Sequence, residues 1–224
     1  MSNHDINKLI EKGKEILKSL LNNKSVDSEV FNTNINALKR IIVLNPELSK
    51  EVGVLIQKLI ATKKWHDLKF DLVQVRVLQG RLSIGHRPKI KLIPLLKREG
   101  ITHVLTLLSK KEGAEKIGET VKKSDLEWIW HPMENANPPR SDQYEGYITL
   151  FKKLQHILES YGFIYIHCSA GIHRTGMIVY ALLLYLGFKE LDAKKVLSKL
   201  RKVTHENVGL ERLEWAKNLL KYKE

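Results

Sequence analysis

The sequence predicts an α/β fold in which a central, largely parallel sheet is flanked by helices and preceded by a helical extension. From residue 67 onward, short β-rich runs alternate with helical patterns, which is typical of a layered α/β domain. Residues 1–66 show a helical period without such runs. Hydrophobic residues make up 43% of the 224 residues, which is enough to bury a sizeable core. We therefore expect two parts, a helical extension over residues 1–66 and an α/β domain over residues 67–224.

The extension is predicted to be helical because its apolar residues recur three, four and seven positions apart. One stripe begins at Ile6, a second at Phe31 and a third at Leu48. Asn45 and Pro46 precede the third stripe and are typical of a helix N-cap and first turn. The extension carries no catalytic constellation. It is either a cap packed on the main domain or a module that binds a partner.

The second part contains four β-rich runs, at residues 71–77, 101–108, 126–131 and 163–167. Helical patterns lie between and after these runs, at residues 90–99, 112–123, 142–160, 173–187, 190–202 and 208–222. A proline-rich loop, residues 132–140, follows the third run directly. Loops that a rigid scaffold holds in place often carry function.

Charge and cysteine content narrow the class of protein. The formal net charge of +13 predicts an anionic partner or substrate. Nucleic acid is not the expected partner, since no aromatic stacking pattern or groove-reading motif is present. A single cysteine, Cys168, excludes an intrachain disulfide framework and a cysteine-rich zinc site. No apolar run approaches the ~20 residues of a membrane helix. We expect a cytoplasmic protein without a transmembrane segment.

The segment around Cys168 is predicted to bind a phosphate group. It follows a buried-type strand and opens a helix, where backbone N–H groups and the helix dipole favour an anion. Arg174 can offer a two-pronged donor to phosphate oxygens. A nucleotide-binding Walker loop is excluded because Met177 follows Gly176 where that motif requires lysine. The predicted substrate-binding residues are Ser169, Ala170, Gly171, Ile172, His173 and Arg174.

The pattern Cys168-x5-Arg174-Thr175 resembles the signature of the cysteine-dependent protein tyrosine and dual-specificity phosphatases. The segment HCSAGIHRTG is similar to the signature of the tyrosine-specific branch, whereas the size of the domain and the order of its elements resemble those of the dual-specificity branch. The resemblance covers roughly residues 71–215. It implies that the Cys168 thiolate attacks phosphorus and forms a cysteinyl-phosphate, that Arg174 holds the phosphoryl oxygens, and that Thr175 donates a hydrogen bond to the sulfur. It implies no metal and no cofactor.

The general acid of the resembled family has no direct counterpart here. That family uses an aspartate in the loop where this sequence has Asn135, whose amide cannot donate a proton as a carboxylic acid does. Glu134, one residue away, and Asp142, just beyond the prolines, are the two candidate acids. A third possibility is that the protein supplies no acid at all.

The resemblance predicts a phosphatase whose substrate is a phosphorylated protein or a small phosphate ester. Lipid and inositol-phosphate branches of the family often carry lysines inside the loop, whereas this loop has Ser169 and Ile172 there. Phosphotyrosine or general phosphoprotein substrates are therefore favoured. Two alternatives stay open: a phosphatase of inositol phosphates or phospholipids, and a catalytically weak phosphatase-like module that binds phosphate.

His167, the residue before Cys168, is predicted either to orient the loop around Cys168 or to be a hydrogen-bonded core residue.

Overall fold

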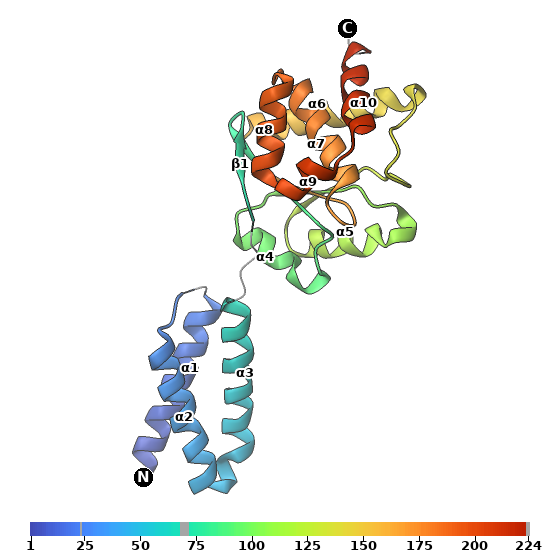
Figure 1. Cartoon of the computed structure of the whole chain (residues 1–224). Helices are drawn as coiled ribbons and strands as arrows, with labels where there is room; N and C mark the ends of the chain where they lie inside the picture. The colour runs from blue at the N-terminus through green and yellow to red at the C-terminus, as the bar shows by residue number, and fades with distance from the viewer. Residues whose placement is uncertain (23, 68–71, 223–224) are drawn as a thin grey trace. The chain divides into compact units, whose positions relative to one another are not determined.

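The structure is a computed structural model that describes residues 1–22, 24–67 and 72–222. The chain forms two compact units, Met1–Lys69 and Phe70–Glu224, which we call the N-terminal and C-terminal units (Figure 1). None of the helices within the described residues has the length and apolar character needed to cross a bilayer.

Within its described residues the N-terminal unit forms three α-helices, as the apolar stripes predict. These are α1 (Asn3–Leu21), α2 (Ser28–Leu44) and α3 (Ser49–Asp67). Ser2 and Asp27 cap the first two helices through their side-chain oxygens. The apolar faces of all three helices form one buried cluster of their own. This unit therefore has a separate hydrophobic core.

The C-terminal unit is built on a five-stranded sheet in the order β1-β2-β5-β3-β4. Strands β2, β5, β3 and β4 are parallel, and β1 pairs with β2 in the antiparallel sense. The predicted, largely parallel sheet is thus confirmed. The strands are β1 (Val75–Val77), β2 (Gly80–Gly85), β3 (His103–Thr106), β4 (Glu127–Trp130) and β5 (Phe163–His167).

Strand β2 was not predicted as a strand, although it pairs along the full length of β5. It is a short segment with glycine at both ends and buried Ser83 within it, so it shows neither a clear alternation nor a continuous apolar run. Its partner β1 is joined to it by a two-residue turn in which Leu78 has a φ of 53°. The predicted run at residues 71–77 forms a strand only over Val75–Val77, and residue 71 lies outside the described residues.

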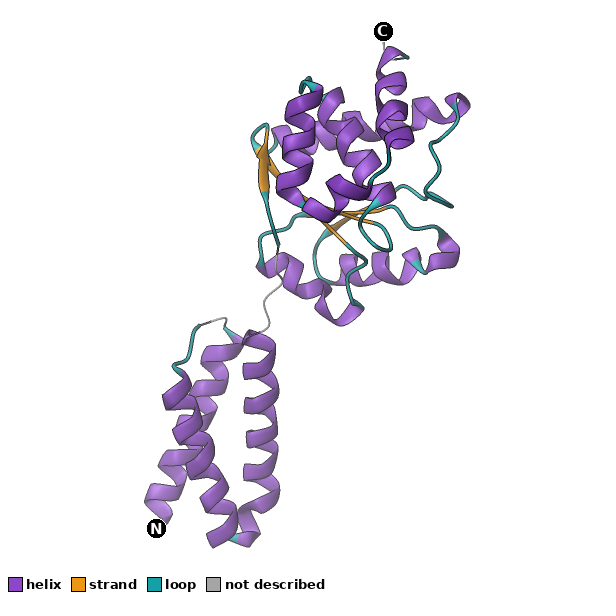
Figure 2. Ribbon diagram, viewed as in Figure 1, coloured by secondary structure: helices purple, strands orange, loops and turns teal. Residues whose placement is uncertain are grey.

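Helices cover both faces of this sheet (Figure 2). One face packs against helices that follow the proline-rich loop, and the other packs against two helices that precede it. The side chains of β5 point alternately to the two faces of the sheet. Ile164 and Ile166 pack in the buried cluster on the face covered by the later helices, and Phe163 and Tyr165 pack in the cluster on the opposite face. The helices are α4 (Ile93–Arg98), α5 (Ala114–Lys123), α6 (Tyr144–Glu159), α7 (His173–Tyr185), α8 (Glu190–Leu200), α9 (Lys202–Asn207) and α10 (Leu210–Lys221).

The structure divides one of the predicted helices into two elements. The expected helix over residues 190–202 ends at Leu200, and the short helix α9 follows as a separate element.

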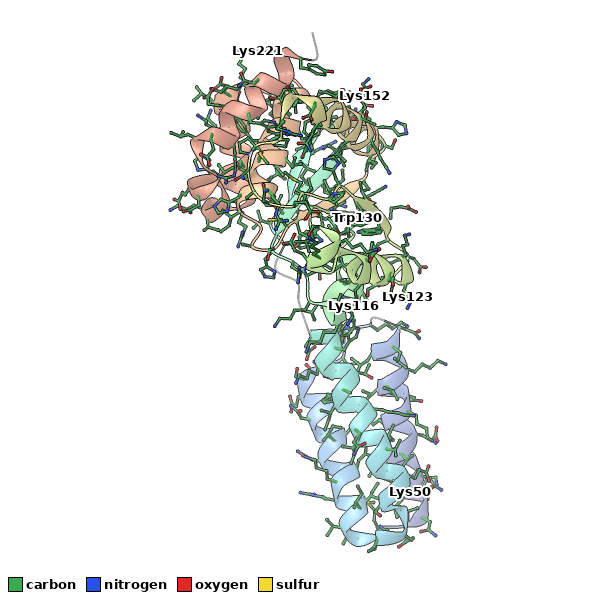
Figure 3. All side chains as sticks on the ribbon, turned by 90° about the vertical axis from the view of Figure 1, so that its right-hand side faces the viewer. Lys50, Lys116, Lys123, Trp130, Lys152 and Lys221 are labelled. Atoms are coloured by element: carbon green, nitrogen blue, oxygen red, sulfur yellow. The ribbon has the colours of Figure 1, made fainter. Side chains whose placement is uncertain are left out.

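Trp128 and Trp130 of β4 stack with their ring centroids 5.4 Å apart, and both pack against the buried cluster that includes residues of α4 and α5. Trp130 is labelled in Figure 3. The two rings therefore add to the packing on the face of the sheet that α5 covers.

Candidate active site

Cys168 lies at the carboxyl end of β5, near the middle of the sheet. Strand β5 ends at His167 and α7 begins at His173, so five residues connect the two elements. We call residues 168–174 the nucleophile loop. Cys168 is buried with 3% of its surface exposed, and its Sγ accepts a hydrogen bond from the Gly171 N–H at 3.2 Å. The sulfur thus lies under the loop, at the edge of the sheet where ligands of open α/β folds bind.

The carbonyl groups of the nucleophile loop are held from outside the loop. The backbone N–H of Arg87 donates to the Ser169 carbonyl at 2.9 Å. One guanidinium nitrogen of Arg201 donates to the carbonyls of Ala170 and Gly171, both at 2.9 Å. The Thr204 hydroxyl donates to the same Gly171 carbonyl at 2.7 Å. Because carbonyl and N–H point in opposite directions across a planar peptide, these contacts favour N–H groups that face the phosphate position.

Gly171 is required by the close approach of β2 to this loop. Its φ is +70°, and a Cβ at this position would lie 2.2 Å from the Gly85 carbonyl oxygen. Only glycine adopts this backbone conformation without a steric cost and also leaves room for the neighbouring strand. The packing of β2 therefore fixes the shape of the loop.

Arg174 is locked by a carboxylate that the sequence did not reveal. Its two terminal nitrogens donate to Glu112 Oε2 at 2.6 Å and Oε1 at 2.7 Å, a two-pronged ion pair. The pair lowers the pKa of Glu112 to about 2. Glu112 is itself fixed, since its carboxylate accepts the Ser109 N–H at 3.0 Å. Arg174 also donates to the Met133 carbonyl at 2.8 Å, so it connects the nucleophile loop to the proline-rich loop.

The other predicted loop residues differ in exposure. Ser169, Ala170 and His173 are exposed and Ile172 is half-buried. Thr175 is fully buried, but its hydroxyl has no hydrogen-bond partner among the described residues. The expected hydrogen bond from Thr175 to the Cys168 sulfur is therefore absent in this structure, and the sulfur accepts a hydrogen bond from the Gly171 N–H.

His167 is a fully buried residue in a hydrogen-bonded network below the loop. Its Nε2 lies 3.0 Å from the Thr106 hydroxyl and its Nδ1 lies 3.2 Å from the Cys168 carbonyl oxygen. The Trp128 indole N–H donates to the same Thr106 hydroxyl at 2.9 Å. Burial lowers the pKa of His167 to about 4. The ring is therefore neutral at physiological pH and anchors the residue before Cys168.

We expect the stability of the C-terminal unit to fall as the pH drops from about 6.5 to about 4, partly through His167. The folded state holds His167 neutral, whereas the unfolded state takes up the proton near pH 6.5, so protonation favours unfolding across that window. The free energy of unfolding in urea, measured at several pH values, tests this. His167→Asn should flatten the pH dependence, and the same change at exposed His156 should leave it unaltered; equal slopes for the wild type and His167→Asn would contradict the assignment.

The candidate acids lie in and beside the proline-rich loop. Glu134 is exposed, and Asn135 uses its side-chain oxygen to accept the Asn137 N–H at 2.8 Å. Asp142 lies in a short 3₁₀ turn beyond the loop and pairs with Arg140 at 3.1 Å, with both side chains largely exposed. The loop lines a cavity of about 390 Å³ that Tyr147 of α6 also lines. Glu134 and Asn135 follow Met133 in the sequence, and the Met133 carbonyl accepts a hydrogen bond from Arg174.

A protein-family model described as the DSP-PTPase phosphatase domain of the Swiss Army Knife protein matches residues 74–219 of the chain. No curated protein matches the sequence significantly.

Several solved structures share the fold. Kinase associated phosphatase (KAP), with its catalytic-site cysteine replaced by serine, has 15% identity and a TM-score of 0.59, and covers 70% of this chain and 97% of that one. The active form of Tk-PTP has 19% identity and a TM-score of 0.54, and covers 66% of this chain and 97% of that one. PTPMT1 has 20% identity and a TM-score of 0.51, and covers 66% of this chain and 94% of that one.

Proposed function

This chain is a phosphatase of the DSP-PTPase family, and we propose that it hydrolyses phosphotyrosine or other phosphoprotein monoesters through a phosphoryl intermediate on Cys168. The observation that carries the proposal is the position of the Cys168 sulfur. It lies at the end of the central strand β5, beneath a loop whose carbonyls are held outward and whose Arg174 is fixed by Glu112. This arrangement supports the proposal that Cys168 is a nucleophile at the base of an anion-binding loop.

The reaction proceeds in two displacements at phosphorus. In the first, the Cys168 thiolate attacks, the S–P bond forms and the P–O bond to the leaving group breaks, while a protein acid protonates the departing oxygen. In the second, water attacks the phosphoryl group and the S–P bond breaks. The displaced thiolate and inorganic phosphate are released, and the water proton goes to the conjugate base of that acid.

Arg174 and the loop N–H groups stabilise the charge on the transferred phosphoryl oxygens. Phosphoryl transfer needs mainly positioning and electrostatic stabilisation from the protein. Glu112 holds the Arg174 guanidinium through two hydrogen bonds, so the side chain loses little further freedom when substrate binds. The Arg174 guanidinium, fixed in this way, is therefore part of the preorganised phosphate site.

We assign the proton donor to Glu134 in preference to Asp142. Glu134 is the residue that follows Met133, whose carbonyl receives the Arg174 guanidinium. Asp142 instead makes an exposed ion pair with Arg140 in the turn before α6. A carboxylate held by Arg140 in that turn is the less available of the two candidates as a proton donor. Asn135 cannot serve, since its side-chain oxygen accepts a hydrogen bond within the loop and its amide does not ionise in this range.

Glu134→Gln is expected to lower kcat for a phosphotyrosine peptide by about 10- to 100-fold and to remove the basic limb of the pH–rate profile. For para-nitrophenyl phosphate, a substrate with a good leaving group, the loss should be small because that phenolate departs without a proton. Asp142→Asn is the matched control and should behave like the wild type on both substrates. A basic limb that persists in Glu134→Gln and disappears in Asp142→Asn would reverse the assignment.

The substrate class is tested by steady-state hydrolysis in the presence of EDTA. The nucleophile loop carries Ser169 and Ile172 without any lysine, which favours a single phosphate group over a polyphosphorylated inositol ring. We expect phosphotyrosine peptides to be turned over faster than phosphoserine peptides or inositol phosphates. Faster turnover of an inositol phosphate would replace the protein-phosphatase assignment. Vanadate binding without turnover of any substrate would support the binding module that Asn135 suggests.

A reducing compartment suits this chemistry, because the thiolate of Cys168 must stay unoxidised to attack phosphorus. We therefore propose a cytoplasmic location. The role of the N-terminal unit as a partner-binding module stays a prediction.

A further inference from the structure

The proline-rich loop is held at two of its backbone carbonyls by two arginines from different parts of the chain. Arg174 donates to the Met133 carbonyl at 2.8 Å, and Arg212 Nε donates to the Ala136 carbonyl at 2.6 Å. The two carbonyls stand on either side of Glu134 and Asn135. The residues at the expected position of the proton donor are therefore the ones that lie between the two anchors.

Arg212 lies in the first turn of α10, 76 residues after Ala136 in the sequence (α10 is labelled in Figure 1). Its side chain is only 13% exposed, and its Nη1 donates to the Val208 carbonyl at 3.0 Å and to Glu211 Oε1 at 2.5 Å. Gly209 has a φ of +91°, and a Cβ there would lie 2.6 Å from Arg212 Nη1. The positive φ favours glycine at this position, and a side chain there would displace the Arg212 guanidinium.

Among the described residues, few other hydrogen bonds hold the middle of the loop, since the contact of the Met133 N–H with the Leu107 carbonyl and that of the Arg140 N–H with Gln143 lie toward its two ends. Pro132, Pro138 and Pro139 have no N–H to donate. The side-chain contact of Asn135 is made within the loop, to the Asn137 N–H, and does not tie the loop to the rest of the unit. The short hydrogen bond from the charged Arg212 to Ala136 is thus a strong external anchor on the loop's second half.

We propose that Arg212 is a positioning residue for the phosphatase reaction. By holding Ala136 it fixes the Glu134–Asn135 segment in place, so that a proton reaches the leaving-group oxygen as the P–O bond breaks. Proton transfer depends steeply on the placement of the donor, and a displacement of about 1 Å can cost about 100-fold in rate. The inference rests on the proposed function, because it requires a proton donor in the loop.

Kinetics on two substrates with different leaving groups test Arg212. In Arg212→Ala, kcat for a phosphotyrosine peptide should fall by about 10- to 100-fold, because that phenol leaves poorly without a proton. For para-nitrophenyl phosphate, kcat should fall by less than about threefold, because the nucleophile loop and Arg174 are unchanged. Arg212→Lys keeps a charged donor and should recover part of the loss. Lys217→Ala is the matched control, since Lys217 lies on the same helix and pairs with Glu190 and Glu214 away from the loop.

An equal loss on both substrates, or no loss on either, in a variant that keeps the wild-type melting temperature, would overturn the positioning role. If Arg212→Ala is too unstable to assay, Arg212→Met, which keeps the apolar stem and removes the donor, carries the same comparison, and its failure to show a leaving-group split would also contradict the proposal. Failure of the proposed function has a different signature, since wild-type turnover would then persist in Cys168→Ser. A split in Arg212→Ala without one in Glu134→Gln would keep Arg212 as the positioning residue and remove Glu134 as the donor.

Discussion

Cys168→Ser is expected to lower kcat for para-nitrophenyl phosphate on the order of 10⁴-fold or more, as removal of an enzymatic nucleophile does elsewhere. A serine hydroxyl is un-ionised at neutral pH, and the hydrogen bond that the Cys168 side chain makes comes from the Gly171 N–H, which cannot act as a base to activate it. The measurement is steady-state hydrolysis in EDTA with reduced protein.

The same variant should keep its affinity for inorganic phosphate. The loop carbonyls stay held by Arg201 and Thr204, and Arg174 stays paired with Glu112, so the predicted anion site remains when the sulfur is removed. Calorimetric titration with phosphate checks that the serine variant is folded and competent to bind. Near-wild-type turnover by this variant would rule out Cys168 as the nucleophile.

Arg174→Lys is expected to lower kcat for the same substrate by about 10²- to 10³-fold. A lysine carries one donor group on a flexible stem and cannot contact both oxygens of Glu112 while it also reaches Met133 and the phosphoryl oxygens. The change also leaves Glu112 as a partly buried carboxylate with a weaker partner, so a lower melting temperature should accompany the loss of activity.

The comparison that separates these two effects is Glu112→Gln. The amide keeps one acceptor for Arg174 and removes the charge, so it should lose stability and retain more activity than Arg174→Lys. Equal activity of Arg174→Lys and the wild type would show that the guanidinium fork does not hold the phosphoryl group.

The local parts of the site could be predicted from the sequence. Cys168, Gly171 and Arg174 lie within seven residues, on a strand-to-helix turn whose hydrogen-bonding geometry follows from the backbone. Their arrangement therefore depends little on distant contacts. The fold class was also predictable, because four of the five strands and most helices show their own periodicity.

The residues that complete the site were not predictable in this way. Glu112, Arg201 and Arg212 reach the nucleophile loop and the proline-rich loop from segments that are 30 to 76 residues away in the sequence. Each is an ordinary charged residue on a helix or turn by its local pattern, and only the packing of the sheet and its helices brings it to the site. Strand β2 was missed for a related reason, since its strand character comes from pairing with β5 rather than from its own alternation.

Thr175 shows the opposite case. The family pattern implied a hydrogen bond to sulfur, but in this chain the hydroxyl is buried without a partner among the described residues. The motif fixes which residue stands at a position, whereas the donor that contacts the sulfur in the structure is the Gly171 N–H.

The measurement that tests the central claim most directly is the trapping of the phosphoryl group on Cys168. Wild-type protein is mixed with para-nitrophenyl phosphate and quenched in acid within one turnover. The protein is then digested, and the masses of its peptides are measured by mass spectrometry. We predict one added phosphoryl group on the peptide that contains Cys168, at a level that decays when substrate is exhausted, and none in Cys168→Ser. Turnover without this species, or with the phosphoryl group on another residue, would contradict the mechanism.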